Sequence, residues 1–590
     1  MSLDQTLIDQ LITDNIETWT STVKTKATTG RGSSKKLELY GVKKLRELIL
    51  ELAVRGKLVP QDPSDEPASI LLEHIEEEKA QLIKEKKIKK PKKLPEISDG
   101  ERLFSLPQGW VSVRWGEMAY WAIGSGFPKS AQGESGHNIL FSKVSDMNLA
   151  GNEKFINTTV NTVSDEVAIK IKAKLHPKGT VVFPKIGGAI ATNKRRILTC
   201  DTAIDNNCLG LTPSVGITSD YLYLILSKTD LVAYQAGTSV PALSQSTLEL
   251  IVAALPPVKE QHRIVSKVDE LMTLCDQLEQ QTEASIEAHQ VLVTTLLDTL
   301  TNSANSEELM QNWQMVAEHF DTLFITEESI DQLKQTILQL AVMGKLVPQD
   351  PNDEPAAKLL ERIAEEKALL IKEKKIKKSQ STDSIIEDNC DWTLSEGWDC
   401  AELQELCRFI DYRGKNPKKS DHGVRLITAK NIRNGYIKND PVEYISEELY
   451  EQWMVRGLPK KRDILFITEG HTMGYVAQVD LGYLFALAQR TICLQSIGDL
   501  SPEYLRIVLM SPQFQLMVKD NETGSAAGGV KASKLKRLPI PIPTLREQKI
   551  IAERVDCLLA ICEQLKVQLK ESQVIQLHLT DAIVEQCNPM

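Results

Sequence analysis

The sequence predicts a mixed α+β fold in which two globular α/β segments are joined by long helices, with the whole arrangement built twice. Two observations carry most of this prediction. Residues 49–90 align without a gap to residues 337–378, and 34 of the 42 positions are identical. The stretch "EQHRIVSKVDELMTLCDQL" from Glu260 matches "EQKIIAERVDCLLAICEQL" from Glu547 at nearly the same spacing, and a shorter "GW" pair repeats the first spacing. Markers that recur at one spacing indicate a tandem internal repeat.

The length and the distribution of charge agree with several domains of different character. A chain of 590 residues is too long for one hydrophobic core. The net charge is −10, but residues 105–258 hold 13 Lys and Arg against 11 Asp and Glu, and residues 393–545 hold 20 against 18. Each of these two middle segments therefore has a net charge of +2, and the acidity belongs to the remaining frame. This distribution leaves nucleic acid open as a partner of the middle segments.

Each copy of the repeat begins with a helical frame. A helix is expected to end at Gly56 in the first copy and at Gly344 in the second, where glycine suits the left-handed C′ position. A connector with three prolines follows, and the run 65–67, "DEP", is expected to open a second helix with proline in its first turn. The basic run at 84–90 fits the C-terminal end of that helix.

Each copy then continues into a mixed α/β middle segment and closes with a long helix. Strands are expected in "GTVVFPKI" from Gly179, "RDILFIT" from Arg462 and "LPIPIP" from Leu538. The closing helices have apolar residues at steps of three and four with a polar interruption, which is typical of a coiled-coil seam. The expected seam residues are Ile264, Val268, Leu271, Cys275, Leu278, Leu292 and Leu296, and Ile551, Val555, Leu558, Cys562, Leu565, Leu569, Leu579 and Ile583.

Five segments follow from these patterns. They are an N-terminal helical region at 1–105, a first middle segment at 106–257, a central helical region at 258–390, a second middle segment at 391–543, and a C-terminal long helix at 544–590.

Sequence motifs of catalysis are absent from the chain. It lacks a phosphate-binding GxxxxGK[ST] loop, a GxSxG elbow, an HExxH zinc motif, kinase loops, and the Asn/Asp-Pro-Pro-aromatic tetrapeptide of amino-methyltransferases. Ten cysteines are scattered without a CxxC pair or zinc-ligand spacing. We expect no catalytic residue, no metal and no cofactor in this chain. The N-terminus lacks the form of a signal peptide, and no apolar run is long enough to span a membrane, so a cytoplasmic location is expected.

The middle segments contain polar loops that suit DNA. The first has "IGSGFPKSAQGESGHN" from Ile123 and "KIGGAIATNKRRILT" from Lys185. The second has "DYRGKNPKKSDHG" from Asp411, "TAKNIRNGYIK" from Thr428 and "TEGHTMG" from Thr468. Glycine allows close backbone approach, Arg and Lys read guanine, and Asn and Gln read adenine in the major groove. The alternative is ordinary polar surface loops rich in turn-forming residues.

The whole chain resembles the DNA-specificity subunit of type I restriction–modification enzymes. The resemblance rests on "GSGFPKS…FSKVSDMN" with "KGTVVFPKIGG", on "YRGKNPKKS…TAKNIRNGYI" with "RDILFITEG", and above all on "IPIPTLREQKIIAERVDCLL". One departure is Thr180, which stands where Asp463 stands in the second copy. The resemblance implies that the two middle segments are target-recognition domains that read the halves of a bipartite, asymmetric DNA site. It also implies that the long helices pack antiparallel and set the unread spacer, with approximate two-fold symmetry.

The resemblance implies partners as well. Two modification subunits would supply S-adenosylmethionine and methylate adenine, and two restriction subunits would use ATP and Mg for translocation and cleavage. Carried onto this sequence, the residues expected to contact DNA are Lys129, Lys143, Lys185, Thr192, Asn193, Lys194, Arg195, Arg196, Arg413, Lys415, Lys418, Lys419, Lys430, Asn431, Arg433, His471, Gln489 and Arg490.

Two other readings stay open from the residues. One is a fused methyltransferase or nuclease with a motif that is not recognised, which would bind S-adenosylmethionine by itself. The other is a coiled-coil adaptor whose middle segments bind protein, which would show no sequence-selective DNA retention.

Overall fold

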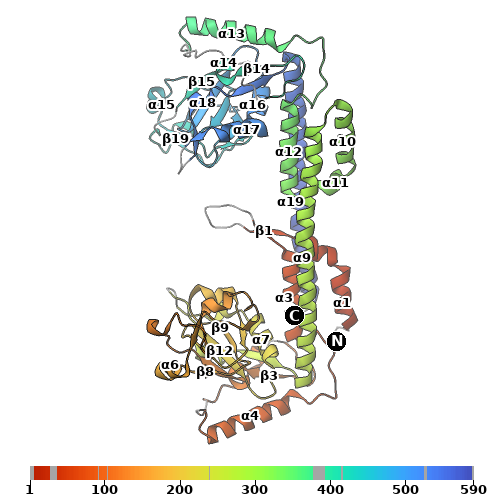
Figure 1. Ribbon diagram of the computed structural model, residues 1–590, viewed down its shortest axis with the longest axis vertical. Helices are drawn as coiled ribbons and strands as arrows, with labels where there is room; N and C mark the ends of the chain where they lie inside the picture. Colours follow the sequence, from red (N-terminus) through yellow and green to blue (C-terminus); the bar gives the residue numbers. More distant parts are fainter. Residues whose placement is uncertain are drawn as a thin grey trace. The chain divides into compact units, whose positions relative to one another are not determined.

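The computed structural model describes residues 5–26, 36–88, 90, 92–102, 104–237, 240–376, 392–412, 416–523 and 528–587. The chain divides into two compact units. Unit 1 comprises Met1–Ser285 and Gln573–Met590, and unit 2 comprises Ile286–Ser572. Each unit contains helices and one α/β head (Figure 1). We call residues 111–255 head 1 and residues 399–542 head 2.

Unit 1 is built on helices that surround the start of one long helix and the end of another. Its α3 donates from Arg46 to Asp276 and Glu279 of α9 at 2.6 and 2.8 Å. At its other end, the Tyr40 hydroxyl donates to Asp581 of α19 at 2.8 Å. The elements of this frame are α1 (Gln5–Asp14), α2 (Ile16–Ser21), β1 (Lys24–Lys26), β2 (Lys36–Glu38), α3 (Tyr40–Val54), α4 (Ala68–Lys84), α9 (Val258–Asn302) and α19 (Leu545–Cys587).

Unit 2 repeats this frame with the roles of the two long helices exchanged. Its α12 runs parallel to α9 and antiparallel to α19, so α9 and α19 are antiparallel within this unit. The contacts that fix these directions are those of Gln332 with Thr294, Lys345 with Thr301, Asp331 with Lys566 and Lys334 with Glu563. The helices of this frame besides α9 and α19 are α10 (Ser306–Glu318), α11 (Phe320–Leu323), α12 (Glu327–Val342) and α13 (Ala356–Lys372).

Head 1 consists of two sheets and a separate strand pair. One sheet has the order β4-β12-β9-β10-β6, the other has the order β7-β5-β11-β8, and β3 pairs with β13. The elements are β3 (Val111–Arg114), α5 (Trp115–Met118), β4 (Ala119–Ile123), η2 (Lys129–Ala131), β5 (Ile139–Ser142), η3 (Val144–Asn148), β6 (Phe155–Ile156), β7 (Asn161–Val163), α6 (Asp165–Lys170), β8 (Leu175–His176), β9 (Val181–Pro184), η4 (Gly187–Thr192), β10 (Arg196–Leu198), β11 (Thr202–Ile204), β12 (Cys208–Pro213), α7 (Ser219–Lys228), η5 (Leu231–Tyr234), α8 (Gln245–Leu248) and β13 (Val252–Leu255).

Head 2 has a similar set of elements. Its sheets have the orders β15-β23-β20-β21 and β19-β16-β22, and β14 pairs with β26. The elements are β14 (Asp399–Glu402), α14 (Leu403–Leu406), β15 (Cys407–Asp411), β16 (Val424–Ile427), β17 (Ile432–Arg433), β18 (Tyr436–Ile437), β19 (Tyr444–Ile445), α15 (Glu447–Trp453), β20 (Ile464–Ile467), β21 (Val476–Gln478), β22 (Phe485–Leu487), β23 (Thr491–Ser496), α16 (Pro502–Met510), α17 (Pro512–Asp520), β24 (Glu522–Thr523), β25 (Gly529–Val530), α18 (Ala532–Leu535) and β26 (Pro539–Ile542).

The two heads share a topology that their sequences hide. The order β4-β12-β9-β10 matches β15-β23-β20-β21, and β7-β5-β11 matches β19-β16-β22. In the second of these matched sheets, one neighbouring strand pair is parallel in each head: β5 with β11 in head 1, and β16 with β22 in head 2. Thr180 and Asp463, which differ between the copies, occupy equivalent turns. The Thr180 N–H donates to the Pro177 carbonyl, and the Asp463 N–H donates to the Lys460 carbonyl. One scaffold therefore carries two different sets of loops.

The repeated connector is confirmed in detail. Gly56 and Gly344 end their helices with φ of +65° and +67°. The residue after each glycine donates back to Leu52 or Leu340, as in a Schellman motif. The second helix begins at Ala68 or Ala356, so Pro67 is its N-cap rather than a residue of its first turn. The three strands expected in the middle segments are also present, as β9, β20 and β26.

The expected seam is correct over the first half of each long helix and is displaced by one residue at Leu292 and Leu579 after the polar interruption, whereas Ile583 is buried as expected. Ile264 through Leu278 and Ile551 through Cys562 include the buried positions, but Leu292 is 50% exposed and Leu579 is 49% exposed. The neighbouring Val293 and Thr580 are buried instead. A straight helix drifts by about 20° per heptad relative to a 3.5-residue repeat, so an apolar stripe that crosses a long interruption resumes at a shifted position.

Two leucine substitutions in α9 test this register. Leu297 is buried in the core of unit 2 and Leu292 is half-exposed. Leu297→Ala should destabilise unit 2 by about 2–5 kcal/mol because it leaves a cavity, whereas Leu292→Ala should change stability by less than about 0.5 kcal/mol. Scanning calorimetry of the two variants measures both effects. Equal shifts in the melting temperature would contradict the assigned register.

Candidate nucleic-acid interface

A buried glutamine at the start of each long helix holds the head in place. The Gln261 side chain accepts a hydrogen bond from the backbone N–H of Thr218, the N-cap of α7, at 3.0 Å and donates to the Pro256 carbonyl at 3.2 Å. Gln548 does the same in unit 2, with Ser501 at the N-cap of α16 and with Pro543. Both side chains are fully buried. The "EQ" pair of the repeat is therefore a junction between head and helix.

The preceding glutamate in each unit is buried in the same junction. Glu260 accepts from the connector residue Gln61 at 3.2 Å, and Glu547 accepts from the indole N–H of Trp398 at 2.9 Å. Burial raises the pKa of Glu260, and burial together with the nearby Asp353 raises the pKa of Glu547 to about 7. These carboxyl groups tie the connector and the first strand of the head to the long helix.

The acidic residues of the connector complete the attachment. Asp65, whose side chain is 2% exposed, pairs with Arg263 of α9 at 2.8 Å. In unit 2, Arg546 of α19 pairs with Asp350 at 3.0 Å and with Asp353 at 3.4 Å. The repeated "QDPxDEP" sequence is thus used twice for one purpose, which is to fix the angle between helix, connector and head.

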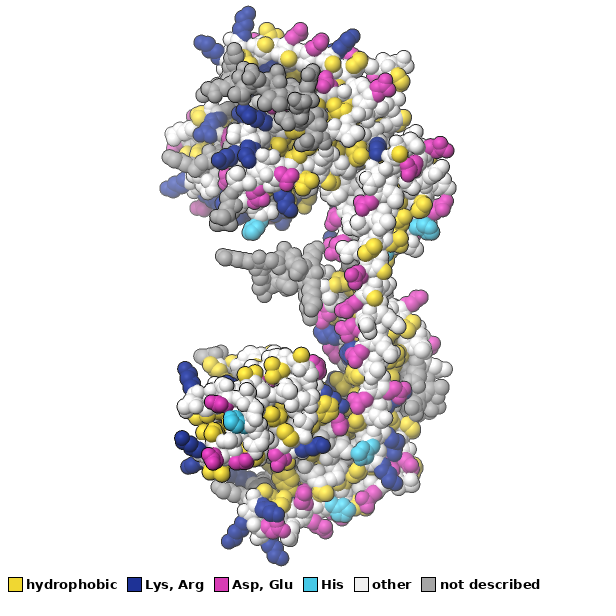
Figure 2. Space-filling view, viewed as in Figure 1, with side chains coloured by type: hydrophobic (Ala, Val, Ile, Leu, Met, Phe, Trp, Pro, Cys, Tyr) yellow, Lys and Arg dark blue, Asp and Glu magenta, His cyan; other side chains and the backbone are white. Residues whose placement is uncertain are grey.

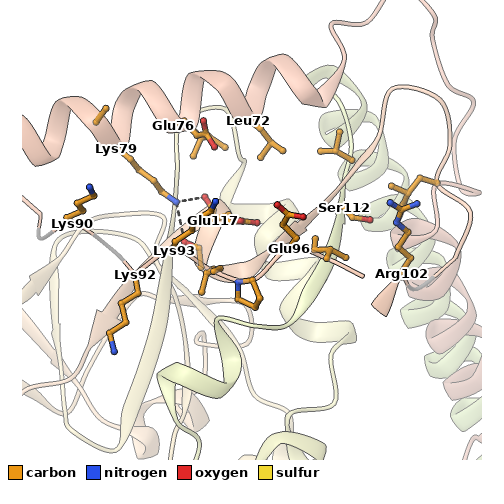
Figure 3. A pocket seen from close by; sticks show the side chains of 18 of the residues that line it. Leu72, Glu76, Lys79, Lys90, Lys92, Lys93, Glu96, Arg102, Ser112 and Glu117 are labelled. Atoms are coloured by element: carbon orange, nitrogen blue, oxygen red, sulfur yellow. Dashed lines mark hydrogen bonds between the residues drawn. The ribbon is translucent and has the colours of Figure 1, made fainter. Parts of the chain in front are cut away.

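The second frame helix of each copy is anchored by an equivalent lysine. In unit 1, Lys79 of α4 donates to the carbonyls of Gly116 and Glu117 at 3.2 and 2.5 Å, beside an open pocket between α4 and residues 90–106 (Figure 3). In unit 2, Lys367 of α13 donates to the Gln404 carbonyl and to the Glu405 carboxylate at 2.9 and 2.6 Å. Burial lowers the pKa of Lys79.

Three loops meet at one end of head 1. The Asp205 N–H donates to the Ser142 carbonyl at 3.0 Å, which joins the loop after β11 to the loop after β5. The backbone N–H of Lys185 donates to the backbone carbonyl of Asn207 at 2.7 Å, which joins the loop after β9 to the loop after β11. The segment after β4 joins them as well, because a Cβ on Gly124 would lie 1.8 Å from the Asp205 carbonyl oxygen. We call this end the tip of head 1.

Head 2 has the same tip. The Ala488 N–H donates to the Ile427 carbonyl at 2.9 Å, and the Thr468 N–H donates to the backbone carbonyl of Arg490 at 2.9 Å. The two tips also match in one further backbone contact. The Leu243 N–H donates to the Lys185 carbonyl in head 1, and the Val530 N–H donates to the Thr468 carbonyl in head 2, each at 2.9 Å. The backbone of the tip is therefore common to both heads.

The side chains at matched tip positions differ. Lys185 corresponds to Thr468, the exposed Gly188 to the exposed His471, and the exposed Asn207 to the exposed Arg490. A common backbone with different polar side chains can present two different hydrogen-bonding patterns to a ligand. On the face of the molecule that Figure 2 shows, Lys and Arg side chains on the heads are interspersed with carboxylates rather than gathered into one basic sheet.

Several expected contact residues lie at or beside the tip of head 1. Lys143 is half-buried, donates to Gln132 at 3.0 Å and lies 5.7 Å from the Phe127 ring. Lys129 is exposed on the same loop, and Lys185 is half-buried at the end of β9. Thr192 is exposed and donates to Ala189 at 2.6 Å, and the neighbouring Lys194 is half-buried.

Asn193, Arg195 and Arg196 instead serve the packing of head 1. Arg195 is 1% exposed, donates to the Leu226 carbonyl at 3.1 Å and lies 5.4 Å over the Phe183 ring, and its burial lowers its pKa to about 10. Asn193 is exposed, but it accepts from Arg195 at 2.8 Å and donates to Ser227. Arg196 donates to the Met147 carbonyl at 2.7 Å. The contacts of Asn193 and Arg195 hold the loop after η4 against α7, and that of Arg196 holds β10 against η3. Arg195 is therefore buried in head 1, and DNA contact by these three residues stays a prediction.

Asn431 is likewise a turn residue. It is fully buried, and its side-chain oxygen accepts from the Thr428 N–H and hydroxyl, each at 3.0 Å. Asp146 caps the matching turn of head 1 by accepting from the Lys143 N–H at 2.7 Å. The side chain of Asn431 is therefore used within head 2, and DNA contact by this residue stays a prediction.

The remaining expected residues of head 2 that the structure describes are exposed or half-buried. Lys419 and Lys430 are exposed and share Glu443, at 2.8 and 3.8 Å. Arg433 is half-buried and donates to its neighbour Ile432. Lys418, His471 and Arg490 are exposed and Gln489 is half-buried, while Arg413 and Lys415 lie outside the described residues.

Sequence comparison decides the family. The family model described as "Type I restriction modification DNA specificity domain" matches twice, at residues 107–288 and 395–572. The chain belongs to the type I restriction–modification DNA-specificity family. It is the component that recognises DNA and is not itself an enzyme, as the sequence analysis expected.

Named relatives agree over almost the whole chain. This specificity subunit is 38% identical to the type I restriction enzyme EcoAI specificity subunit of Escherichia coli over 98% of this chain and 99% of the relative. It is 36% identical to the EcoEI specificity subunit of Escherichia coli with the same coverage. Among solved structures, the HsdS subunit from Thermoanaerobacter tengcongensis matches with 17% identity and a TM-score of 0.39, covering 82% of this chain and 98% of that one.

Within the described part of the chain, no group of three or more His, Cys, Asp or Glu side chains is placed to hold a metal ion. Of the helices in that part, none combines the length and apolar character that crossing a membrane requires.

The sequence analysis of this specificity subunit missed Asn206 and Asn207. Both are exposed on the loop before β12, and they correspond to Gln489 and Arg490. Their only sequence signal is the pair of asparagines before an apolar strand, which is also typical of an ordinary turn. The correspondence with Arg490 became visible only when the two tips were matched through their backbone hydrogen bonds.

The buried Glu547 should make the stability of unit 2 depend on pH. Its folded pKa of about 7 lies above the ordinary value of 4.5, so its contribution is complete below about pH 4.5 and is lost as pH rises through 7. Unit 2 should therefore lose about 1 kcal/mol between pH 6 and pH 8. Glu547→Gln should remove this loss and be the more stable protein at pH 8. Melting temperatures across this range, with no difference between the two proteins in their pH dependence, would refute the assignment.

Proposed function

We propose that this specificity subunit reads a bipartite, asymmetric DNA site, with one half read by each head. The observation that carries the proposal is the common tip with different side chains, Lys185, Gly188 and Asn207 in head 1 against Thr468, His471 and Arg490 in head 2. One docking geometry with two sets of base-reading groups would yield two different half-sites on the two-fold-related backbone of DNA.

The proposed contact residues follow from exposure and from the tips. Arg490 would read guanine, and Asn206, Asn207 and Gln489 have side chains that suit adenine. Lysines around the tips would hold phosphates. The proposed set is Lys129, Lys143, Lys185, Thr192, Lys194, Asn206 and Asn207 in head 1 and Arg413, Lys415, Lys418, Lys419, Lys430, Arg433, His471, Gln489 and Arg490 in head 2.

The rest of the assembly is proposed from the family. The five predicted segments would act as recognition domains at 106–257 and 391–543 held by a helical frame, with α9 and α19 setting the unread spacer. The repeated frame would bind two modification subunits, which would supply S-adenosylmethionine and adenine methylation, the target base leaving the stack on their side. Two restriction subunits would use ATP and Mg. We propose that the assembly works on double-stranded DNA in the cytoplasm.

Genome-wide mapping of methyl-adenine tests this proposal in cells that make the chain with its modification partner. We expect one bipartite motif. Arg490→Ala should relax the motif in one half, by about 1–3 kcal/mol for the base that it reads, and Asn207→Ala should relax the other half. Equal relaxation of both halves by either variant would show a folding or phosphate role, and methylation without any bipartite motif would refute the function.

Binding by the isolated chain should be weak. Each middle segment has a net charge of only +2, from 13 basic against 11 acidic residues in the first and 20 against 18 in the second. Because affinity for DNA rises with the number of phosphates neutralised, tight binding should need a more basic partner subunit. Filter binding at physiological salt measures this, and a nanomolar Kd for the chain alone would contradict it.

A further inference from the structure

The two heads differ in charge at one short helix beside their matched tips. In head 1 the chain leaves the tip at Leu243 and forms α8, and in head 2 it leaves the tip at Val530 and forms α18. These helices match at an offset of 287, which also matches β13 with β26, and each of them buries its last residue, a leucine. The structure therefore aligns residues 244–250, "SQSTLEL", with residues 531–537, "KASKLKR".

This alignment places charges of opposite sign at equivalent positions. Residues 531–537 contain four basic residues and no acid, whereas residues 244–250 contain one acid, Glu249, and no basic residue. The net charges of the two stretches are therefore +4 and −1. The whole second middle segment, residues 393–545, has 20 basic against 18 acidic residues. Seven residues therefore carry more net positive charge than the whole segment that contains them.

Two of the four basic side chains are exposed and lack an acidic partner. Lys531 and Lys534 are both exposed, and among the residues that the structure describes no carboxylate pairs with either. Lys536 is half-buried instead, with its ammonium nitrogen 5.2 Å from the centre of the Phe409 ring. In the view of Figure 2, Lys and Arg side chains lie over the place where Figure 1 labels α18. Residues three positions apart are neighbours on a helix, so the two exposed lysines repel each other, and an anion that contacts both would offset this repulsion.

Backbone hydrogen bonds hold these lysines beside the tip of head 2. Lys531 directly follows Val530, whose N–H donates to the carbonyl of the tip residue Thr468 at 2.9 Å. At the other end of the stretch, the Gln404 N–H donates to the Lys536 carbonyl at 2.9 Å. Since the major groove is about 12 Å wide, the phosphates that flank it lie about 6 Å to either side of the bases read at its centre. A lysine anchored next to the tip can reach such a phosphate.

We propose that Lys531 and Lys534 bind the phosphate backbone that flanks the half-site read by head 2, and that head 1 lacks the equivalent contact. This inference rests on the proposed function and adds two residues to it that the sequence analysis did not select. The contact would contribute affinity without base preference, because phosphates are the same at every base pair. The matched residues of head 1 are the uncharged Ser244 and Thr247. The two heads would therefore contribute unequally to affinity.

The test uses the full chain assembled with its modification partner. The variant is Lys531→Gln with Lys534→Gln. The matched control is Lys460→Gln with Lys461→Gln, which removes two exposed lysines of the same head that precede β20, at the end of that strand opposite to Thr468. Affinity is measured from about 50 to about 200 mM salt on a duplex that carries the methylated motif and on a scrambled duplex.

We expect the Lys531 and Lys534 variant to bind both duplexes more weakly, with the slope of log affinity against log salt shallower by about 1.8, which is two phosphates at about 0.9 each. Its affinity deficit at the lowest salt should exceed that at the highest about tenfold. The methylated motif should stay the same, because no base contact is removed. Lys531→Arg with Lys534→Arg should keep the original slope, and so should the control pair. Thr247→Lys in head 1 should make the slope steeper by about 0.9, because it adds a lysine at the position equivalent to Lys534.

A slope equal to that of the control would overturn the proposal. Loss of the modification partner by the Lys531 and Lys534 variant with an unchanged salt slope would overturn it as well, since the lysines would then bind protein. So would an unchanged slope for Thr247→Lys, because the two positions would then not face equivalent phosphates. The proposed function fails separately, if the original complex binds both duplexes equally. In that case the slope of the lysine variant still decides whether α18 contacts phosphate.

Discussion

The architecture depends on the buried Glu-Gln pair at the start of each long helix. Gln261 and Gln548 each accept a hydrogen bond from the N-cap residue of a head helix and donate to the carbonyl before the long helix. The neighbouring Glu260 accepts from the connector residue Gln61, and Glu547 accepts from Trp398, which directly precedes β14 of head 2. A buried polar group is costly unless its hydrogen bonds are made. The buried hydrogen bonds therefore favour one orientation of each head on its long helix, which a domain that recognises DNA requires.

This constraint explains why the frame and the heads of the repeat differ in similarity. The connector and frame helices must satisfy the same buried partners twice, such as Lys79 with Gly116 and Lys367 with Gln404, and they are nearly identical in sequence. The heads need only keep a topology, and their exposed tip residues are free to vary. Specificity can thus change at Asn207 or Arg490 without disturbing the junction that aims the head.

Positive charge in this family member is distributed according to role. The heads carry small net charges, and some of their arginines, such as Arg195, are used for packing.

The sequence by itself determined the tandem repeat, the helix ends at Gly56 and Gly344, three strands of the heads (β9, β20 and β26) and the family, because these depend on local conformational preference and on identity between the copies. It placed the seam correctly up to Leu278 and failed at Leu292, since the drift of a helix past a polar interruption depends on what packs against it. It could not show that Arg195 and Asn431 are buried while Asn207 is exposed at the tip of head 1, because the direction and burial of a side chain are set by distant segments. The tertiary structure alone decided which loops meet at each tip, because backbone hydrogen bonds between segments far apart in the sequence bring those loops together.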